Sequence, residues 1–293
     1  MNFKNIKKEI IIGTAQLQSN YGIANIGHDK NANKSQDFLS YALDNNYTKI
    51  DTAYAYKNAH KIIGKLVLKK NYKPELYTKL PKLSSTTDNN IYEIFKKSLK
   101  ELNLNKISGL LLHSSNDWEN KDLKSFIEKI INNKSISKFG LSIYEITEII
   151  EDSMIKLIQV PGNIFNQEIL LSKELNEFEK NGGEIHVRSV FVQGLILMHS
   201  NKIPKKFEKF KKAIMSFQNI SRELSVDPAI LAISCVKYII PKSKIVLGFD
   251  NIEQLKILND IEKLEISDSD VIEVIKFGKK YRNKYWDPRM WNT

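Results

Sequence analysis

The feature that most constrains the fold of this chain is an alternation of short apolar runs with longer segments of helical periodicity. Several of the intervening segments repeat apolar residues at steps of three and four, which predicts amphipathic helices over 36–45, 88–102 and 121–132. Strands that alternate with helices favour a parallel sheet. The apolar runs, rich in Ile, Val and Leu, cover residues 9–13, 47–51, 75–79, 108–113, 137–142, 155–160, 184–189 and 244–248.

The number of repeats selects one architecture among the parallel α/β folds. Eight strand–helix units without a linker rich in Pro, Gly or Ser predict a (β/α)8 TIM barrel that occupies residues 1–293 as a single domain. A doubly wound dinucleotide-binding sheet would carry a glycine fingerprint after its first strand. The corresponding loop here reads "GTAQLQSNYG", which lacks the GxGxxG spacing.

Charge and apolar content limit the classes of partner. The net charge is +11, but the lysines are spread over many predicted helices, which indicates a solvated surface rather than a nucleic-acid interface. No apolar run approaches the roughly 20 residues that span a bilayer, so no membrane association is expected. Cys235 is the single cysteine, which excludes an internal disulfide and fits the cytoplasm. Its apolar surroundings predict a buried thiol.

Polar residues close most of the predicted strands. In a (β/α)8 barrel the C-terminal strand ends converge on one mouth, where the chemistry of such barrels takes place. One isolated polar strand end is more simply explained by its exposure to solvent. An acid, a base, an imidazole and nearby tyrosines on neighbouring strands together predict an active site. The polar residues at or near strand ends are Asp51, Lys79, His113, Ser142, Gln159, Arg188 and Ser189.

The acid, the lysine and the imidazole suit the polarisation of a carbonyl group. A tyrosine has an ordinary pKa of about 10, and a nearby lysine ammonium lowers it. Asp51 is placed to balance the charge of Lys79, and His113 to donate a hydrogen bond to an oxygen that gains negative charge. Either Tyr54 or Tyr56 could supply the phenol. If hydride reaches the carbonyl carbon at the same time, the product is an alcohol, and no metal is required.

The same residues resemble those of the aldo-keto reductases. The stretch "DTAYAY" matches that family's Asp–Thr–Ala–x–x–Tyr element, and Lys79 in "LYTKLPK" and His113 in "LLLHSS" match its lysine and histidine. The resemblance implies a cytoplasmic oxidoreductase that reduces an aldehyde or ketone with Tyr56 as general acid. It implies catalytic roles for Asp51, Tyr56, Lys79 and His113.

The resemblance also implies a nicotinamide dinucleotide, bound in extended form across the barrel mouth. NADP(H) is favoured over NAD(H), although Gln254 stands where NADP-dependent members carry an arginine for the 2′-phosphate. Ser142 and Gln159 would hold the carboxamide, and residues 248–255 the adenosine phosphate end. The implied cofactor-binding residues are Gly13, Thr14, Ser142, Gln159, Arg188, Ser189, Gly248 and Gln254.

Besides Gln254, three positions depart from the family pattern. Ile143 replaces the asparagine that often follows Ser142, and His60 is interpreted as a surface residue at a helix start. Arg188 replaces an aromatic ring that stacks on the nicotinamide. A guanidinium beside the oxidised, positively charged ring is unfavourable, so Arg188 could instead pair with an anionic substrate or a cofactor phosphate.

The substrate and two rival functions stay open. The segments "GTAQLQSNYGIAN" and "HVRSVFVQGLIL" are similar to a bacterial branch associated with sugar metabolism, which suggests a sugar-derived carbonyl compound. Tyr21, Trp118, Trp286 and Trp291 could line its pocket or pack within loops. One rival is a Schiff-base lyase or aldolase that uses Lys79. The other is a regulatory subunit that binds the cofactor without turnover. The oligomeric state is left undetermined.

Overall fold

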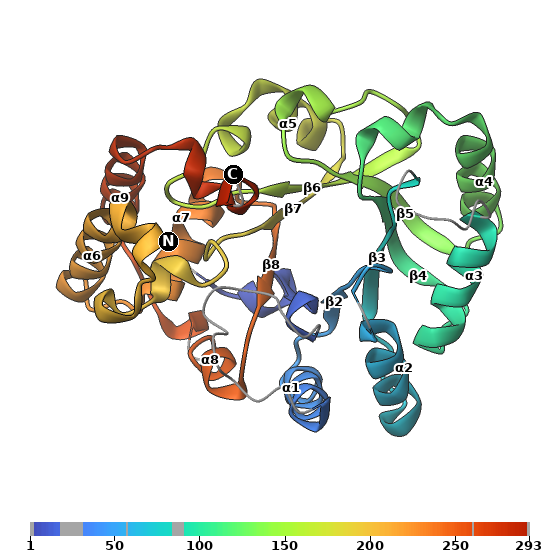
Figure 1. The fold of residues 1–293 in the computed structure, drawn as a ribbon, viewed down its shortest axis with the longest axis horizontal. Coiled ribbons are helices and arrows are strands. Elements are labelled where there is room, and N and C mark those ends of the chain that lie inside the picture. The colour runs from blue at the N-terminus through green and yellow to red at the C-terminus, as the bar shows by residue number, and fades with distance from the viewer. Residues whose placement is uncertain (1–2, 18–31, 57, 84–90, 260, 292–293) are drawn as a thin grey trace.

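The computed structural model describes residues 3–17, 32–56, 58–83, 91–259 and 261–291 (Figure 1). Tyr21 and the first three residues of the predicted helix 88–102 lie outside these ranges, as does most of the segment "GTAQLQSNYGIAN".

Eight parallel strands close into a barrel in which β8 pairs with β1, so the predicted (β/α)8 architecture is confirmed. Every strand lies beside its neighbours in sequence order, which brings the C-terminal strand ends to one mouth. The strands match the predicted ones to within about two residues at each end. They are β1 (Ile10–Gly13), β2 (Lys49–Asp51), β3 (Glu75–Leu80), β4 (Ile107–Leu112), β5 (Ile136–Ser142), β6 (Ile155–Pro161), β7 (Glu184–Arg188) and β8 (Lys244–Gly248).

Helices surround this barrel on its outer face (Figure 1). Short polar side chains define several helix starts: Asn120, Ser172 and Asp227 each accept a hydrogen bond from a backbone N–H of the first helical turn. Between β5 and β6 the structure has only a short 3-10 turn over Ile146–Glu148. The α-helices are α1 (Ala32–Asp44), α2 (Ala59–Lys70), α3 (Ile91–Leu102), α4 (Lys121–Asn132), α5 (Lys173–Lys180), α6 (Glu208–Glu223), α7 (Pro228–Ile239), α8 (Ile252–Lys256) and α9 (Asp268–Lys280).

The two-residue period of each strand divides the apolar residues into two cores. The larger core lies between barrel and helices and contains outward residues such as Ile12, Leu112 and Val187. A small second cluster fills the barrel with Ile11, Tyr77, Leu111 and Leu157. Tight contact between β5 and β6 requires Gly140, because a Cβ there would lie 1.9 Å from the backbone oxygen of Leu157.

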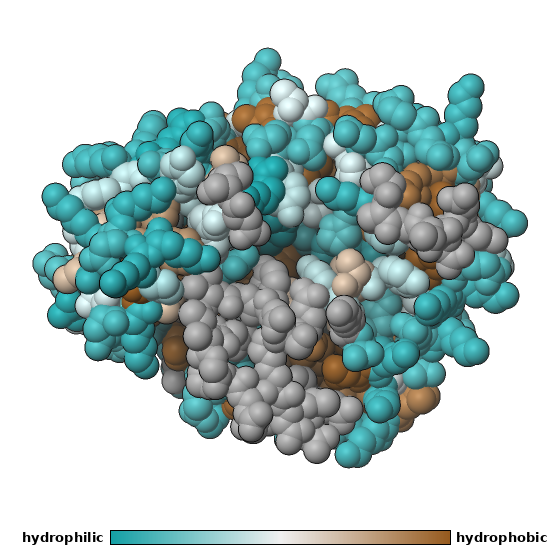
Figure 2. Space-filling model, in the orientation of Figure 1, coloured by the Kyte–Doolittle hydropathy of each residue, from teal (hydrophilic) through white to brown (hydrophobic). Residues whose placement is uncertain are grey.

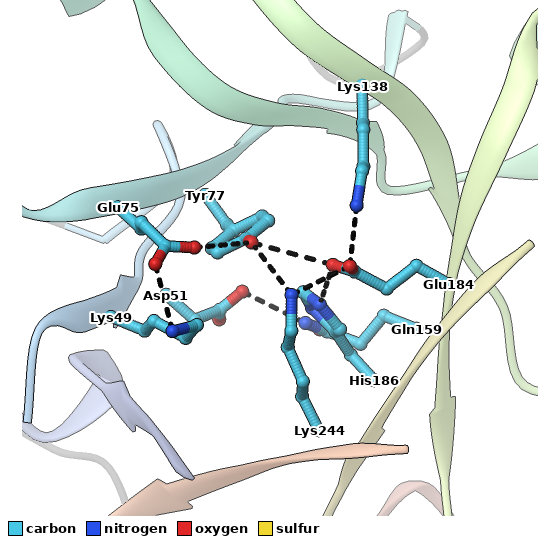
Figure 3. A network of polar contacts seen from close by, with 9 residues as sticks. All are labelled: Lys49, Asp51, Glu75, Tyr77, Lys138, Gln159, Glu184, His186 and Lys244. Atoms are coloured by element: carbon cyan, nitrogen blue, oxygen red, sulfur yellow. Dashed lines mark hydrogen bonds and ion pairs between the residues drawn. The ribbon is translucent and has the colours of Figure 1, made fainter. Parts of the chain in front are cut away.

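A cluster of charged residues occupies the N-terminal end of the barrel (Figure 3). The Glu184 carboxylate accepts hydrogen bonds from Lys138 at 2.6 Å, Lys244 at 2.7 Å and His186 Nε2 at 2.7 Å. Burial alone would raise the pKa of Glu184, but these partners outweigh burial and hold it well below its usual range. Glu184 and Lys244 begin their strands, so this cluster lies away from the mouth and stabilises the fold.

The outer surface of the described chain is predominantly hydrophilic, as Figure 2 shows for one face. No helix in the described part of the chain is both long and apolar enough to cross a membrane. The prediction for Cys235 is confirmed: the thiol is fully buried in α7, and burial raises its pKa to about 12.

Candidate active site

A cavity of about 660 Å³ opens where the C-terminal strand ends converge. Its volume lies within the range typical of small-molecule sites. All the residues predicted for catalysis and cofactor binding line it, although they come from all eight strands or the segments that follow them. These residues are Gly13, Thr14, Asp51, Tyr56, Lys79, His113, Ser142, Gln159, Arg188, Ser189, Gly248 and Gln254.

The floor of the cavity holds a buried ion pair between Asp51 and Lys79. Lys79 Nζ lies 2.6 Å from both carboxylate oxygens of Asp51 and donates to the Thr52 carbonyl at 3.2 Å. The relative exposures of the two residues are 3% and 2%. Gln159 Nε2 donates a further bond to Asp51 Oδ2 at 2.9 Å. Such short, charge-assisted bonds hold both partners in fixed positions.

Burial shifts the pKa values of the two basic groups at this floor in the same direction. Burial lowers the pKa of Lys79, and the Asp51 carboxylate opposes that shift. Burial also lowers the pKa of His113, to about 3, and the charge of Lys79 adds to the effect. His113 is therefore a neutral imidazole at physiological pH, which suits it to donate a hydrogen bond without carrying charge.

Of the two tyrosines in "DTAYAY", Tyr56 lines the cavity and Lys79 Nζ lies 5.9 Å from its ring centroid. Tyr54 is not among the lining residues; its hydroxyl accepts a bond from Lys97 at 3.4 Å, and its ring meets the edge of His60. Of the two, the tyrosine at the cavity is therefore the one that the resemblance implies as general acid.

The interpretation of His60 as a surface residue is wrong. His60 is only 3% exposed at the start of α2, and its Nε2 forms a 2.9 Å hydrogen bond with Thr78 Oγ1 on β3. Burial lowers its pKa to about 4. His60 does not line the cavity, so it serves packing between α2 and the barrel.

Ser142 and Gln159 lie side by side on β5 and β6 and form one wall of the cavity. The Gln159 side chain is fully buried, and its Oε1 has no hydrogen-bond partner among the described residues, whereas its Nε2 donates to Asp51. A buried acceptor without a donor is costly unless a ligand supplies one. This atom therefore fits a ligand with an N–H group, such as a carboxamide.

The loop after β7 forms a further part of the cavity wall in an uncommon backbone conformation. Ser189, Val192 and Gln193 have φ angles of 64°, 50° and 54°, followed by Gly194 at 88°. Positive φ is a genuine outlier for a β-branched residue such as Val192, and strain of this kind concentrates at functional sites. Ser189, Gln193 and Gly194 line the cavity.

The far end of the cavity lies against Gly248 and the start of α8. A Cβ at Gly248 would lie 1.9 Å from the side-chain nitrogen of Gln16, so glycine leaves room for that side chain. Gln254 Oε1 accepts a bond from the backbone N–H of Asp250 at 2.8 Å. An arginine-like cation is absent at Gln254, and Asp250 adds a carboxylate to this end of the lining.

Some candidates lie elsewhere, and some lining residues escaped prediction. None of the three tryptophans lines the cavity: Trp118 and Trp286 are buried against Phe139 and Phe165, and Trp291 packs against Phe207. The residues around each tryptophan in the sequence do not indicate these contacts. Position just after a strand or just before a helix could have indicated the lining residues that were missed, which include Gln16, Tyr144, His199, Lys202 and Asp227.

Comparison with known proteins places this geometry in context. The model of the Aldo/keto reductase family matches residues 9–278. No curated protein matches the sequence. An aldo-keto reductase from Klebsiella pneumoniae in complex with NADPH is 14% identical, with 94% of this chain and 92% of that chain covered and a TM-score of 0.71. The glycerol dehydrogenase from Gluconobacter oxydans is 19% identical, with 93% and 92% covered and a TM-score of 0.72. An aldo-keto reductase from Bacillus halodurans, in its holo form, is 17% identical, with 94% of both chains covered and a TM-score of 0.72.

Proposed function

Because the chain belongs to the aldo/keto reductase family, we propose that its cavity reduces the carbonyl group of an aldehyde or ketone with a nicotinamide cofactor. One observation carries the proposal: Lys79 Nζ is held at 2.6 Å by both oxygens of Asp51 in the floor of a cavity that Tyr56 and His113 also line. A sugar-derived carbonyl compound is the proposed substrate class, on the resemblance of residues 186–197 to a bacterial branch.

Each of the four residues has a separate task in this proposal. Tyr56 donates its phenolic proton to the carbonyl oxygen as that oxygen gains charge. The Lys79 ammonium favours the phenolate that remains, and the Asp51 carboxylate stabilises that ammonium against the effect of burial. His113 orients the carbonyl oxygen as a neutral hydrogen-bond donor, which agrees with its lowered pKa of about 3.

The wall formed by Ser142 and Gln159 suits the cofactor. When bound, the nicotinamide supplies the hydride that the carbonyl carbon accepts. The unpartnered Gln159 Oε1 is an acceptor for its carboxamide, and Ser142 on the neighbouring strand is the second polar contact. Gly13, Thr14, Ser189, Gly248 and Gln254 line the rest of the path toward α8.

NADP(H) is the proposed form of the cofactor. The support is the Klebsiella pneumoniae relative, whose structure contains NADPH. The far end of the cavity favours NAD(H) instead, because Gln254 carries no charge there and the Asp250 carboxylate would repel a 2′-phosphate. An experiment in which NADPH and NADH compete for the chain decides which of the two cofactors binds more tightly.

The Schiff-base alternative is disfavoured by the surroundings of Lys79. A nucleophilic lysine must present an unprotonated amine to its substrate. Three oxygen atoms within 3.2 Å of Nζ match the three donors of an ammonium, two from Asp51 and one from Thr52. The comparisons give no support to this alternative or to a regulatory subunit without turnover.

The test is an assay of cofactor oxidation at 340 nm with a panel of aldehydes, ketones and sugars, run with NADPH and NADH in parallel. We expect consumption of the cofactor together with formation of the corresponding alcohol. Cofactor binding by calorimetry without turnover on any carbonyl compound would favour the regulatory subunit. Borohydride trapping of a substrate on Lys79 without a nicotinamide would favour the lyase.

A further inference from the structure

Arg188 places a guanidinium next to the wall proposed to hold the carboxamide. It ends β7, beside β6, and its register partner Pro161 lies two residues beyond Gln159. Its Nη2 donates to the carbonyl of Ile143 at 3.1 Å, and Ile143 directly follows Ser142. A ring held by Ser142 and Gln159 therefore lies beside this cation.

No carboxylate among the described residues neutralises the charge of Arg188. Its guanidinium carbon lies 4.1 Å from the ring centroid of Tyr144, and Arg289 lies 4.0 Å from the same centroid. Arg289 forms ion pairs with Asp287 and Glu145 at 2.5 and 2.7 Å. Arg188 forms none with any described residue, and it lines the cavity, which Arg289 does not.

The field of this cation extends across the cavity floor. The charge of Arg188 is among the causes that lower the pKa of Lys79 and of His113. Within a partly enclosed cavity, such a charge acts more strongly on a bound ring than it would in water. The nicotinamide ring is uncharged when reduced and carries a positive charge when oxidised.

We propose that Arg188 makes the cavity discriminate between the two charge states of the nicotinamide, favouring the reduced, uncharged ring over the oxidised, cationic ring. The inference rests on the proposed function, because it needs a nicotinamide held by Ser142 and Gln159. Its consequence is that the enzyme releases the oxidised cofactor more readily than the reduced one. An anchor for a cofactor phosphate would instead strengthen binding of both forms alike.

The test compares dissociation constants of the reduced and oxidised forms of whichever cofactor binds, measured by calorimetry on the unmodified chain and on Arg188→Gln. Glutamine retains a donor for the Ile143 carbonyl but removes the charge. We expect the unmodified chain to bind the reduced form at least about fivefold more tightly, the factor for two like charges ~4 Å apart even in a water-like dielectric. In Arg188→Gln, the ratio of the dissociation constant of the oxidised form to that of the reduced form is expected to fall by about the same factor, because the oxidised form binds more tightly.

Two further variants make the result specific. Arg188→Lys keeps the charge and is expected to keep most of the preference, whereas Arg289→Gln removes the other guanidinium on Tyr144 and is expected to leave it unchanged. An unchanged ratio in Arg188→Gln overturns the inference, and equal weakening of both forms assigns Arg188 to a phosphate. Failure of the unmodified chain to bind either form refutes the proposed function itself. Thermal unfolding of each variant confirms that it is folded.

Discussion

Gln159 and Asp51 are 108 residues apart in the sequence, and a 2.9 Å hydrogen bond from Gln159 Nε2 to Asp51 Oδ2 joins them inside the barrel. This bond connects the wall proposed for the cofactor to the ion pair proposed for catalysis (Figure 3). The Gln159 amide is thereby held with its oxygen unpartnered, while the Asp51 carboxylate is held against Lys79. The proposed contact with the cofactor and the position of the ion pair therefore both depend on the Gln159 side chain.

Tyr56→Phe is expected to lower kcat by a factor of about 10² to 10⁴, because it removes the proposed proton donor. The dissociation constant of the cofactor is expected to change little. Tyr54→Phe is the matched control, since Tyr54 is not among the lining residues and its variant should retain activity. Steady-state kinetics and calorimetry check both. Similar activity in the two variants would remove Tyr56 from its role.

Asp51→Leu is expected to cost about 3–5 kcal/mol in the free energy of unfolding, because the Lys79 charge would remain buried without its partner. The double variant Asp51→Leu/Lys79→Met removes both charges and is expected to lose less than the sum of the two single variants. Urea unfolding measures the three free energies. Strictly additive losses would show that the pair is not coupled, contrary to the 2.6 Å contacts.

His60→Gln is expected to reduce the sensitivity of the fold to acid. The pKa of His60 is about 4 in the native state, below the ordinary value of 6.5 for a histidine, so the unfolded chain takes up a proton first as the pH falls. Stability is therefore lost between pH 6.5 and 4, by up to ~3 kcal/mol for this residue. Thermal unfolding from pH 7.5 to 4.5 should show a shallower decline in the variant. An equal decline would mean that His60 is already accessible to protons. His113 and His186, whose pKa values are also lowered, leave some dependence in both proteins.

Gly140→Ala is expected to destabilise the barrel by about 3 kcal/mol or more, because the added Cβ would lie 1.9 Å from the Leu157 oxygen. A backbone atom of β6 cannot move aside as the end of a side chain can. Gly13→Ala is the control, since its Cβ would have no neighbour closer than 3.3 Å. Denaturant unfolding of both variants tests the contrast, and comparable losses would contradict the close approach of β5 and β6.

The sequence by itself determined the barrel, since eight apolar runs separated by helical segments admit few other arrangements. The polar residues at the ends of those runs then predicted much of the cavity lining. It did not show that Tyr54 contacts His60, place His60 in the interior or show that Arg188 has no carboxylate partner among the described residues. Those outcomes depend on contacts between residues far apart in the chain, such as Thr78 with His60 and Tyr144 with Arg188. Periodicity indicates which face of its strand or helix a residue occupies, because the repeats of strands and helices are local. Which partner it meets there is decided only when the barrel closes and distant strands come within bonding distance.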